Sequence, residues 1–337
     1  MKIGIPRALL YYKYEKLWTT FLDGIGVEYI ISPETNREII DNGSKFAVDE
    51  ECLPIKIFLG HIYYLLDKCD YIFLPRIEYT GMGEMCMNFK AQFDLVKNTF
   101  RDYNPQILFY NIAWNKWKNE YKAFKKMGKF LGKKRSQIKC AYYNAKQSQI
   151  AFEMFRNQTQ ENLLVESTKN KVLVVAHAYN VGDKFIGEQV ISVLKSLDCD
   201  PILAEYADAN KCINLSKNVT KTLPWAYNKH LVGAIELYKD KVDGMVILTT
   251  FPCAPDSMVN EMILRKFKEL PTLMLTIDAQ DGSAGVETRL ESFVDILNFK
   301  KERFWWLIKI LLFVFRNGEV IQKHSDICLK MDLKLNI

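Results

Sequence analysis

Short β-rich runs alternate with longer segments of helical periodicity in two stretches of this 337-residue chain. In the first stretch the β-rich runs are KIGIP, VEYIIS, YIFLPRI and QILFYNI, and periodic segments such as 9–23 and 54–67 lie between them. The rhythm restarts at KVLVVAHAYN and continues through PILAEYA, VDGMVILTTF and PTLMLTIDA. Such alternation is typical of βαβ units. We therefore expect an α/β fold with two parallel sheets.

The segment between the two stretches has no convincing strand and indicates about two helices. No sequence period relates the two halves, which excludes short tandem repeats. The predicted parts are an N-terminal α/β domain at 1–112, a basic helical connector at 113–170, a second α/β domain at 171–297 and a C-terminal helical tail at 298–337. We expect the last helix of the second domain near 285–297.

The basic charge of the chain is concentrated in the connector. The formal net charge is +6, and residues 111–170 alone carry 13 Lys and Arg against 4 Glu. Such a surplus suits nucleic acid, an acidic partner protein or a phosphorylated ligand. A solvated helix face explains it equally well, because charge runs usually mean only that.

The bulk composition is that of a soluble globular protein, with 49% hydrophobic and 26% charged residues. The opening MKIGIPRALLYY reads as a strand feeding a turn and not as a signal peptide, so we expect a cytoplasmic protein. The apolar run FWWLIKILLFVF at 304–315 is well short of the roughly 20 residues that cross a bilayer. A core or subunit-facing helix is the expected structure there, ahead of an interfacial membrane anchor.

Three of the eight cysteines lie at the same kind of position, where a strand or loop ends and a helix begins. They are Cys52 before LPIKIFLGHIYYLL, Cys86 before MNFKAQFDLV, and Cys253 before APDSMVNEMILRK. The free N–H groups and dipole of a helix N-terminus favour a thiolate and lower its pKa. Thiolates are ligands for soft metals.

Three thiolates from separate loops, without a local CxxC pair, argue against a structural zinc site. They suit an iron-sulfur cluster with three protein ligands and one open iron. The alternative is packing, since free cysteine is among the most buried residue types. That alternative is our expectation for Cys69, Cys199 and Cys212, while Cys140 and Cys328 offer no context. No disulfides are expected from such scattered cysteines in an unsecreted chain.

Other motifs give weaker signals. GMGEMC at 81–86 approaches GxGxxG, but Cys86 replaces the third glycine and no acidic residue stands at the ribose position. DAQDGSAGVETRLESF at 278–293 is either an anion cradle or a turn with Gly285 near a helix start. No GxxxxGK[ST] motif occurs, so we do not expect the chain itself to hydrolyse ATP. His177 follows a strand and is either a site residue or a structural group, whereas His61, His230 and His324 read as helical or terminal.

Several segments together resemble the 2-hydroxyacyl-CoA dehydratase superfamily, in its activase-related branch. They are IGIPRALLYYKYEKLWTTFL, FAVDEECLPIKIFLGH, HAYNVGDKFI, VDGMVILTTFPCAPDS and LTIDAQDGSAGVETRLESFVDIL, within residues 1–297. The resemblance implies two Rossmann-like domains, with a helical connector and a C-terminal helix added here. It also implies a cubane 4Fe-4S cluster between them, held by Cys52, Cys86 and Cys253.

In the relatives, a separate ATP-hydrolysing activator delivers one electron to the cluster, which passes it to an acyl-CoA thioester. The resemblance thus implies an iron-sulfur protein with an activator partner, an acyl-CoA-type substrate and a second dehydratase-like subunit or a homodimer. Here MCMNFK lacks the proline that often follows the second cysteine, and FPCAPDS replaces the glycines around the third. Only three cysteines match, so a single cubane is favoured over a double one.

Side chains near these cysteines are candidates for tuning the cluster or moving protons, because groups in a desolvated cleft acquire shifted pKa values. The candidates are Glu50, Glu51, Asp256 and His177. The alternative from a different class is a non-catalytic accessory protein that binds an acidic partner or, less favoured, nucleic acid through the basic connector. No membrane partner is expected.

Overall fold

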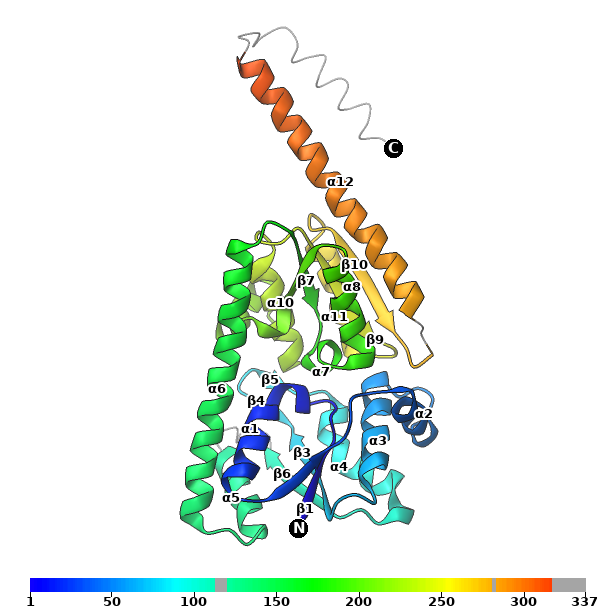
Figure 1. Cartoon of the computed structure of the whole chain (residues 1–337), viewed down its shortest axis with the longest axis vertical. Helices are drawn as coiled ribbons and strands as arrows, with labels where there is room; N and C mark the ends of the chain where they lie inside the picture. The colour runs from blue at the N-terminus through cyan, green and yellow to red at the C-terminus, as the bar shows by residue number, and fades with distance from the viewer. Residues whose placement is uncertain (113–119, 281–282, 317–337) are drawn as a thin grey trace. The chain divides into compact units, whose positions relative to one another are not determined.

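The computed structural model of the chain describes residues 1–112, 120–280 and 283–316. Two four-stranded sheets, parallel throughout, form the centre of the fold (Figure 1). The first contains β1 (Lys2–Ile5), β2 (Glu28–Ile31), β3 (Tyr71–Ile77) and β6 (Ile107–Ile112). The second contains β7 (Asn170–Val175), β8 (Cys199–Leu203), β9 (Gly244–Thr250) and β10 (Thr272–Ile277). The predicted α/β class is confirmed.

Both sheets have the same strand order. The first is ordered β2-β1-β3-β6, and the second, taken from its other edge, β8-β7-β9-β10. In each, the chain starts at an inner strand, adds one strand on one side and then crosses to add two on the other. Loops beyond the carboxyl ends of the strands at such a crossing are the usual place for a site in parallel α/β proteins.

Helices flank both sheets. In the first half they are α1 (Tyr11–Gly24), α2 (Arg37–Phe46), α3 (Leu53–Leu65) and α4 (Met87–Thr99), followed by the short helix η1 (Arg101–Tyr103). In the second half they are α7 (Ala178–Val181), η3 (Lys184–Glu188), α8 (Gln189–Ser196), η4 (Ala204–Tyr206), α9 (Ala209–Val219), α10 (Ala226–Tyr238) and α11 (Ala254–Lys266). Every residue of β9 is buried, as expected for an inner strand of a sheet covered on both faces.

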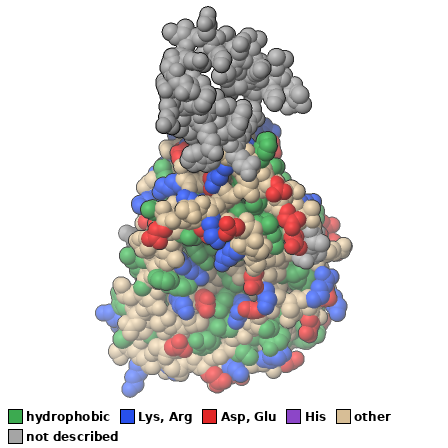
Figure 2. Space-filling model, turned by 45° about the horizontal axis from the view of Figure 1, so that its top comes forward, with side chains coloured by type: hydrophobic (Ala, Val, Ile, Leu, Met, Phe, Trp, Pro, Cys, Tyr) green, Lys and Arg blue, Asp and Glu red, His purple; other side chains and the backbone are tan. Residues whose placement is uncertain are grey.

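Two helices occupy the described part of the connector, as predicted. They are α5 (Glu120–Phe130) and α6 (Arg135–Glu166). Helix α6 packs along α1 and reaches β8 and η4, so that it runs beside both halves (Figure 1). Its Gln149 is buried and accepts a hydrogen bond from the Leu17 amide of α1 at 3.1 Å. The space-filling view of one face of the molecule shows basic and acidic side chains interspersed over that face (Figure 2).

Buried polar contacts also join the two halves. The Asp183 carboxylate, which caps η3, accepts hydrogen bonds from the Tyr12 hydroxyl at 3.1 Å and from the Thr35 hydroxyl. Lys13 of α1 forms an ion pair with Glu205 of η4. These contacts fix the loop ends of one sheet against those of the other.

The chain's last described helix is longer than the sequence analysis predicts. Helix α12 runs from Ser283 to Arg316, through the predicted boundary at 297. The compact unit that holds both sheets ends at Leu290. Side chains of the apolar run at 304–315 and all of Cys328 and His324 are outside the described part. Within that part, no helix combines the length and the apolar character needed to cross a membrane.

The GMGEMC segment forms a small hairpin, β4 (Tyr79–Thr80) with β5 (Gly83–Glu84), and not a phosphate loop opening a helix. Gly83 has a φ of +151°, and a Cβ there would lie 2.5 Å from the Pro224 carbonyl oxygen. The glycine is therefore needed for close backbone packing. Asp281 and Gly282 of the other glycine-rich segment are outside the described residues, and Gly285 lies in the first turn of α12.

Candidate functional site

Cys52, Cys86 and Cys253 are the N-cap residues of α3, α4 and α11. Each has an extended backbone, so its side chain lies beside the first turn of the helix that follows. Pro54 and Pro255 stand at the second helical position of α3 and α11, where a missing N–H breaks no helical bond. The sequence prediction that these thiols precede helices is confirmed.

The three N-caps come from different parts of the fold and lie close together. Cys86 and Cys253 line one small pocket with Tyr179. The Leu53 amide, next to Cys52, donates to the Phe251 carbonyl at 3.1 Å and so joins the start of α3 to the loop that carries Cys253. Cys86 follows β3 and Cys253 follows β9, the third strand of each sheet. The equivalent crossing points of the two sheets therefore meet at this site.

Tyr179 lies among the three thiols. Burial raises the pKa of its phenol well above its usual value, and Asp256 and each of the three cysteines raise it further. Its ring stacks on the imidazole of His177 with centroids 5.0 Å apart. The sequence analysis did not single out Tyr179, although it lies inside the quoted motif HAYNVGDKFI, two residues after His177.

The expectation of lowered thiol pKa values is wrong. Burial raises the pKa of Cys52 to about 12 and also raises the pKa of Cys86 and Cys253. The backbone N–H groups at the third helical positions, those of Ile55, Phe89 and Asp256, lower these pKa values, but burial and neighbouring negative groups outweigh them. The thiols are therefore protonated at neutral pH, and a metal that binds here must displace their protons.

The other cysteines are placed differently. Cys199 and Cys212 are buried in β8 and α9, Cys69 is partly buried with its thiol donating to the Leu65 carbonyl, and Cys140 is exposed on α6. No disulfide forms among the seven cysteines in the described ranges.

The two predicted glutamates differ in position. The Glu51 carboxylate accepts the Cys52 amide at 3.1 Å and the Asn88 side-chain amide at 2.7 Å. That same Asn88 amide nitrogen lies 3.7 Å from the Cys52 sulfur. Glu51 therefore orients a hydrogen-bond donor toward a thiol. Glu50 is exposed and makes no hydrogen bond or ion pair with the described residues.

His177 and Asp256 form a buried pair at the ends of β7 and β9. The imidazole Nε2 lies 2.8 Å from the Asp256 carboxylate, which also accepts from Asn228 at 2.9 Å and Thr249 at 3.1 Å. Burial opposes the charge of Asp256, but His177 and the two donors outweigh it and lower its pKa to about 2. Burial likewise opposes the charge of His177, and Asp256 raises its pKa overall. Both shifts favour the charged forms of the two side chains.

The described side chains do not form a site for a single metal ion. No group of three or more His, Cys, Asp or Glu side chains within the described ranges is placed to hold one metal ion. A cubane differs from a single ion because each protein thiolate binds a different iron. Its ligands therefore need to converge only to the width of a cluster, and three sulfur donors match the ligands that iron-sulfur clusters take.

The sequence matches a protein-family model. Residues 2–206 match the family model described as "CoA enzyme activase uncharacterised domain (DUF2229)". The matched region contains Cys52, Cys86 and His177 and ends before Cys253. No curated protein matches the sequence.

Among solved structures the likeness is low. A crystal structure of ZnuA is 10% identical with a TM-score of 0.27, over 88% of this chain and 98% of that one. A sugar transporter from Clostridium phytofermentans is 13% identical with a TM-score of 0.20, over 88% and 92%. Glucosamine-6-phosphate deaminase from Thermotoga maritima is 8% identical with a TM-score of 0.21, over 89% and 84%. These values are too low to indicate a shared function.

Proposed function

Because this chain belongs to the family of the CoA enzyme activase uncharacterised domain (DUF2229), we propose that it is an iron-sulfur electron-transfer component of a CoA-linked system. In this proposal, Cys52, Cys86 and Cys253 hold a 4Fe-4S cluster. An ATP-hydrolysing activator protein donates electrons, and an acyl-CoA or similar molecule accepts them. The observation that carries the proposal is the meeting of three helix N-cap thiols from both sheets around Tyr179.

The donor set fits such a cluster. Three thiols with no histidine between them are the soft ligands that iron-sulfur centres take, and three of them leave one iron without a protein thiolate. Each thiol stands at a helix N-terminus, where the dipole favours the negative charge that a bound thiolate carries. When bound, the cluster supplies one-electron chemistry at this position.

The residues around the thiols hold and shield the site. Glu51 directs the Asn88 amide at the Cys52 sulfur, and such a donor stabilises a thiolate. The buried His177–Asp256 pair fixes the loop after β7 against α11, which Cys253 opens. Tyr179 and Phe89 line the pocket beside Cys86 and Cys253 and limit the access of water.

Metal analysis tests the proposal directly. Protein purified without oxygen should be brown and contain close to four irons and four sulfides per chain. Cys52→Ala, Cys86→Ala and Cys253→Ala should each lose most of the iron and the visible absorption. The matched controls Cys140→Ala and Cys199→Ala should keep both. Retention of the parent iron content in all three site variants would overturn the ligand assignment.

Electron delivery is tested by electron paramagnetic resonance. Mixing the protein with an ATP-hydrolysing activator of this type and MgATP, under a reductant, should produce a signal from a reduced cluster. The signal should be absent without ATP and absent in Cys253→Ala. A signal of equal size without the activator would contradict the proposed role of the activator as electron donor.

A further inference from the structure

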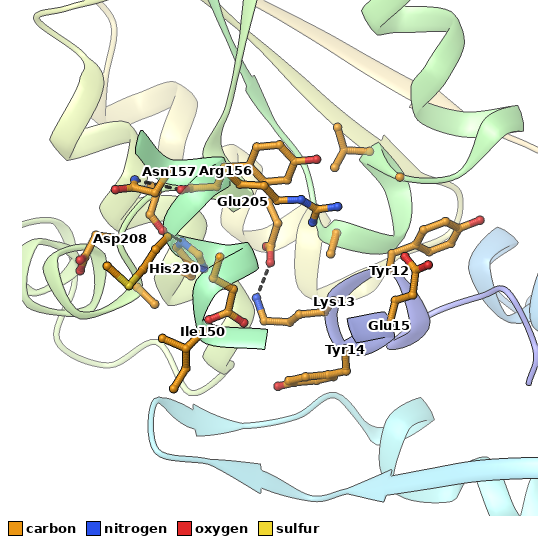
Figure 3. A pocket seen from close by; sticks show the side chains of 18 of the residues that line it. Tyr12, Lys13, Tyr14, Glu15, Ile150, Arg156, Asn157, Glu205, Asp208 and His230 are labelled. Carbon is orange, nitrogen blue, oxygen red and sulfur yellow. Dashed lines mark hydrogen bonds and ion pairs between the residues drawn. The ribbon is translucent and has the colours of Figure 1, made fainter. Parts of the chain in front are cut away.

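A second cavity, with a volume of about 790 Å³, is lined by residues from both halves, and Figure 3 shows side chains on its walls. Its walls come from α1, α6, α7, α10 and the η4–α9 segment, together with Met82 of the β4–β5 turn. The volume is in the range that small-molecule sites occupy. Ala178 and Val181 of α7 line this cavity, whereas His177 and Tyr179 line the cysteine pocket. The two spaces are therefore neighbours with separate walls.

Several charged side chains on the cavity wall already have partners. Lys13 and Glu205 form an ion pair, joined by a dashed line in Figure 3. Arg7 donates to the Ser32 carbonyl oxygen at 3.2 Å and lies 3.8 Å from Glu34. These groups satisfy one another and hold the wall together.

Two further carboxylates on the wall are also occupied. Glu153 accepts the side-chain amide of Gln149 at 2.7 Å, and Asp208 caps α9 by accepting the Lys211 amide at 2.8 Å. Each of these carboxylates therefore already accepts a hydrogen bond from the protein. Their negative charge nevertheless remains on the wall.

One cation on the wall has no anionic partner. Arg156 of α6 stacks its guanidinium over the rings of Phe152, at 3.9 Å, and Tyr206, at 4.7 Å. It makes no hydrogen bond or ion pair with any residue that the structure describes. Stacking fixes the plane of a guanidinium and leaves its N–H edge free, which is the arrangement that receives a carboxylate in two parallel hydrogen bonds.

One carboxylate on the wall has neither a cationic partner nor an amide donor among the described residues. Glu15 of α1 forms no ion pair within the described ranges, and its carboxylate interacts with the Tyr11 phenol. Burial, and then Glu15, raise the pKa of that phenol well above its usual value. Glu15 and Arg156 come from different helices and both side chains are drawn at the cavity in Figure 3.

The rest of the lining decides the kind of molecule that fits. Tyr12, Tyr14, Met82 and Met154 supply aromatic and apolar surface. Three basic side chains face four carboxylates around the cavity, so the lining repels molecules with several negative charges. This balance disfavours nucleotides and the phosphate groups of CoA.

We propose that this cavity binds a small zwitterion of the amino-acid type with an aromatic or other apolar side chain. Arg156 receives the carboxylate, Glu15 receives the ammonium group, and the tyrosines and methionines receive the side chain. Among the described residues Arg156 has no anionic partner and Glu15 has neither a cationic partner nor an amide donor, so these two side chains suit a ligand that carries one charge of each sign. The site stands on contacts outside the cysteine pocket and does not depend on the proposed cluster.

Titration calorimetry on the full-length protein, purified without oxygen, tests this with three related probes. L-phenylalanine carries both charges, 3-phenylpropionate lacks the ammonium group, and phenethylamine lacks the carboxylate. L-phenylalanine should bind at least about tenfold more tightly than either other probe, since one lost charged hydrogen bond costs about 1.5 kcal/mol or more. Equal binding of L-phenylalanine and 3-phenylpropionate would overturn the zwitterion proposal, as would no binding of L-phenylalanine.

Variants test which residue binds the carboxylate of the ligand and which binds its ammonium group. Arg156→Ala should weaken L-phenylalanine and 3-phenylpropionate at least about tenfold and leave phenethylamine unchanged. Glu15→Gln should weaken L-phenylalanine and phenethylamine and leave 3-phenylpropionate unchanged. Arg156→Lys should recover only part of the affinity, because a single ammonium cannot donate two parallel bonds. Uniform loss with all three probes would contradict these roles.

Controls separate this site from protein folding and from the proposed function. Arg265→Ala and Glu261→Gln make the same changes in an exposed ion pair on α11 and should leave binding unchanged. Cys253→Ala should lose iron yet bind L-phenylalanine with the parent affinity. Arg156→Ala should keep the parent iron content. Loss of L-phenylalanine binding in Cys253→Ala would contradict an independent site.

Discussion

The imidazole Nε2 of His177 lies 2.8 Å from the carboxylate of Asp256, and both side chains are almost fully buried, at 4% and 7% exposure. His177 follows β7 and Asp256 lies in the first turn of α11, the helix after the neighbouring strand β9, so their pairing joins the segment after β7 to the start of α11. His177 also stacks on Tyr179, which lies among the three thiols. The pair therefore forms part of the wall of the cysteine pocket.

Replacing Asp256 by Asn should destabilise the protein strongly. The change removes the carboxylate that compensates a buried imidazolium, and breaking a buried pair from one side costs about 3–5 kcal/mol. The pKa of His177 should fall, because burial alone favours its neutral form. Urea unfolding measures the first effect, and nuclear magnetic resonance titration of the histidine measures the second.

A double-mutant cycle with His177→Gln separates the pair from its surroundings. The variant with both changes should be more stable than the sum of the two single losses predicts, because it leaves no buried charge alone. Additive losses would mean that the two side chains act independently, against the geometry described above.

Asn88 should tune the cluster without holding it. Its amide faces the Cys52 sulfur, and a donor to a thiolate stabilises the more negative, reduced state. Asn88→Ala should therefore lower the midpoint potential, on the order of 50 mV for a hydrogen bond of about 1 kcal/mol, at unchanged iron content. Redox titration measures the shift. Asn98→Ala, at the exposed end of the same helix, should leave the potential unchanged.

Local sequence patterns predict the fold class of this protein and the positions where several of its helices begin. The strand–loop–helix rhythm places Cys52, Cys86 and Cys253 at helix N-termini, and the structure has all three there as N-caps. Strand rhythm depends on neighbouring residues, so it is visible in one sequence. The sequence analysis expected one helix near 285–297 and another in the tail from 298, and it did not predict that they form the single helix α12, although no proline or glycine interrupts 298–316.

The side chains that contact the site residues could not be predicted in the same way. Asn88, Tyr179 and Asn228 lie inside helices, and only packing between distant segments brings them to Cys52, the thiols and Asp256. The thiol pKa values were mispredicted for a related reason. A helix N-terminus is a local feature, whereas the burial that outweighs it comes from the whole fold.

His61 should make the protein sensitive to acid. Burial, with a smaller effect of Arg7, lowers its pKa to about 3, so the folded chain keeps it neutral while the unfolded chain protonates it below about pH 6.5. Stability from this group is therefore fully present above pH 6.5 and is lost as the pH falls toward 3. The loss is about 2 kcal/mol at pH 5.

The comparison of His61→Gln with the parent isolates this effect. Gln can keep a hydrogen bond to the Thr35 hydroxyl, which lies 3.1 Å from the imidazole. Between pH 7.5 and pH 5.0 the variant should lose about 2 kcal/mol less unfolding free energy than the parent. Other titrating groups act alike in both proteins. The same acid loss in both would show that His61 is not held neutral.

The close approach of α2 to α3 should be intolerant of a single methyl group. A Cβ at Gly60 of α3 would lie 1.9 Å from the Ile39 carbonyl oxygen, and one at Gly43 of α2 would lie 1.8 Å from the Lys56 carbonyl oxygen. Both obstacles are backbone atoms, so the helices themselves must separate. Gly60→Ala should cost about 1–3 kcal/mol of unfolding free energy, as measured by urea unfolding.

Gly285→Ala is the matched control for Gly60→Ala. No atom lies within 4 Å of a Cβ at Gly285, and alanine is favoured over glycine in a helix, so this variant should be as stable as the parent or up to about 1 kcal/mol more stable. Because α3 begins directly after Cys52, the shift forced by Gly60→Ala should also move that thiol and reduce bound iron. Parent stability and parent iron content in Gly60→Ala would mean that α2 and α3 can separate without disturbing the cysteine site.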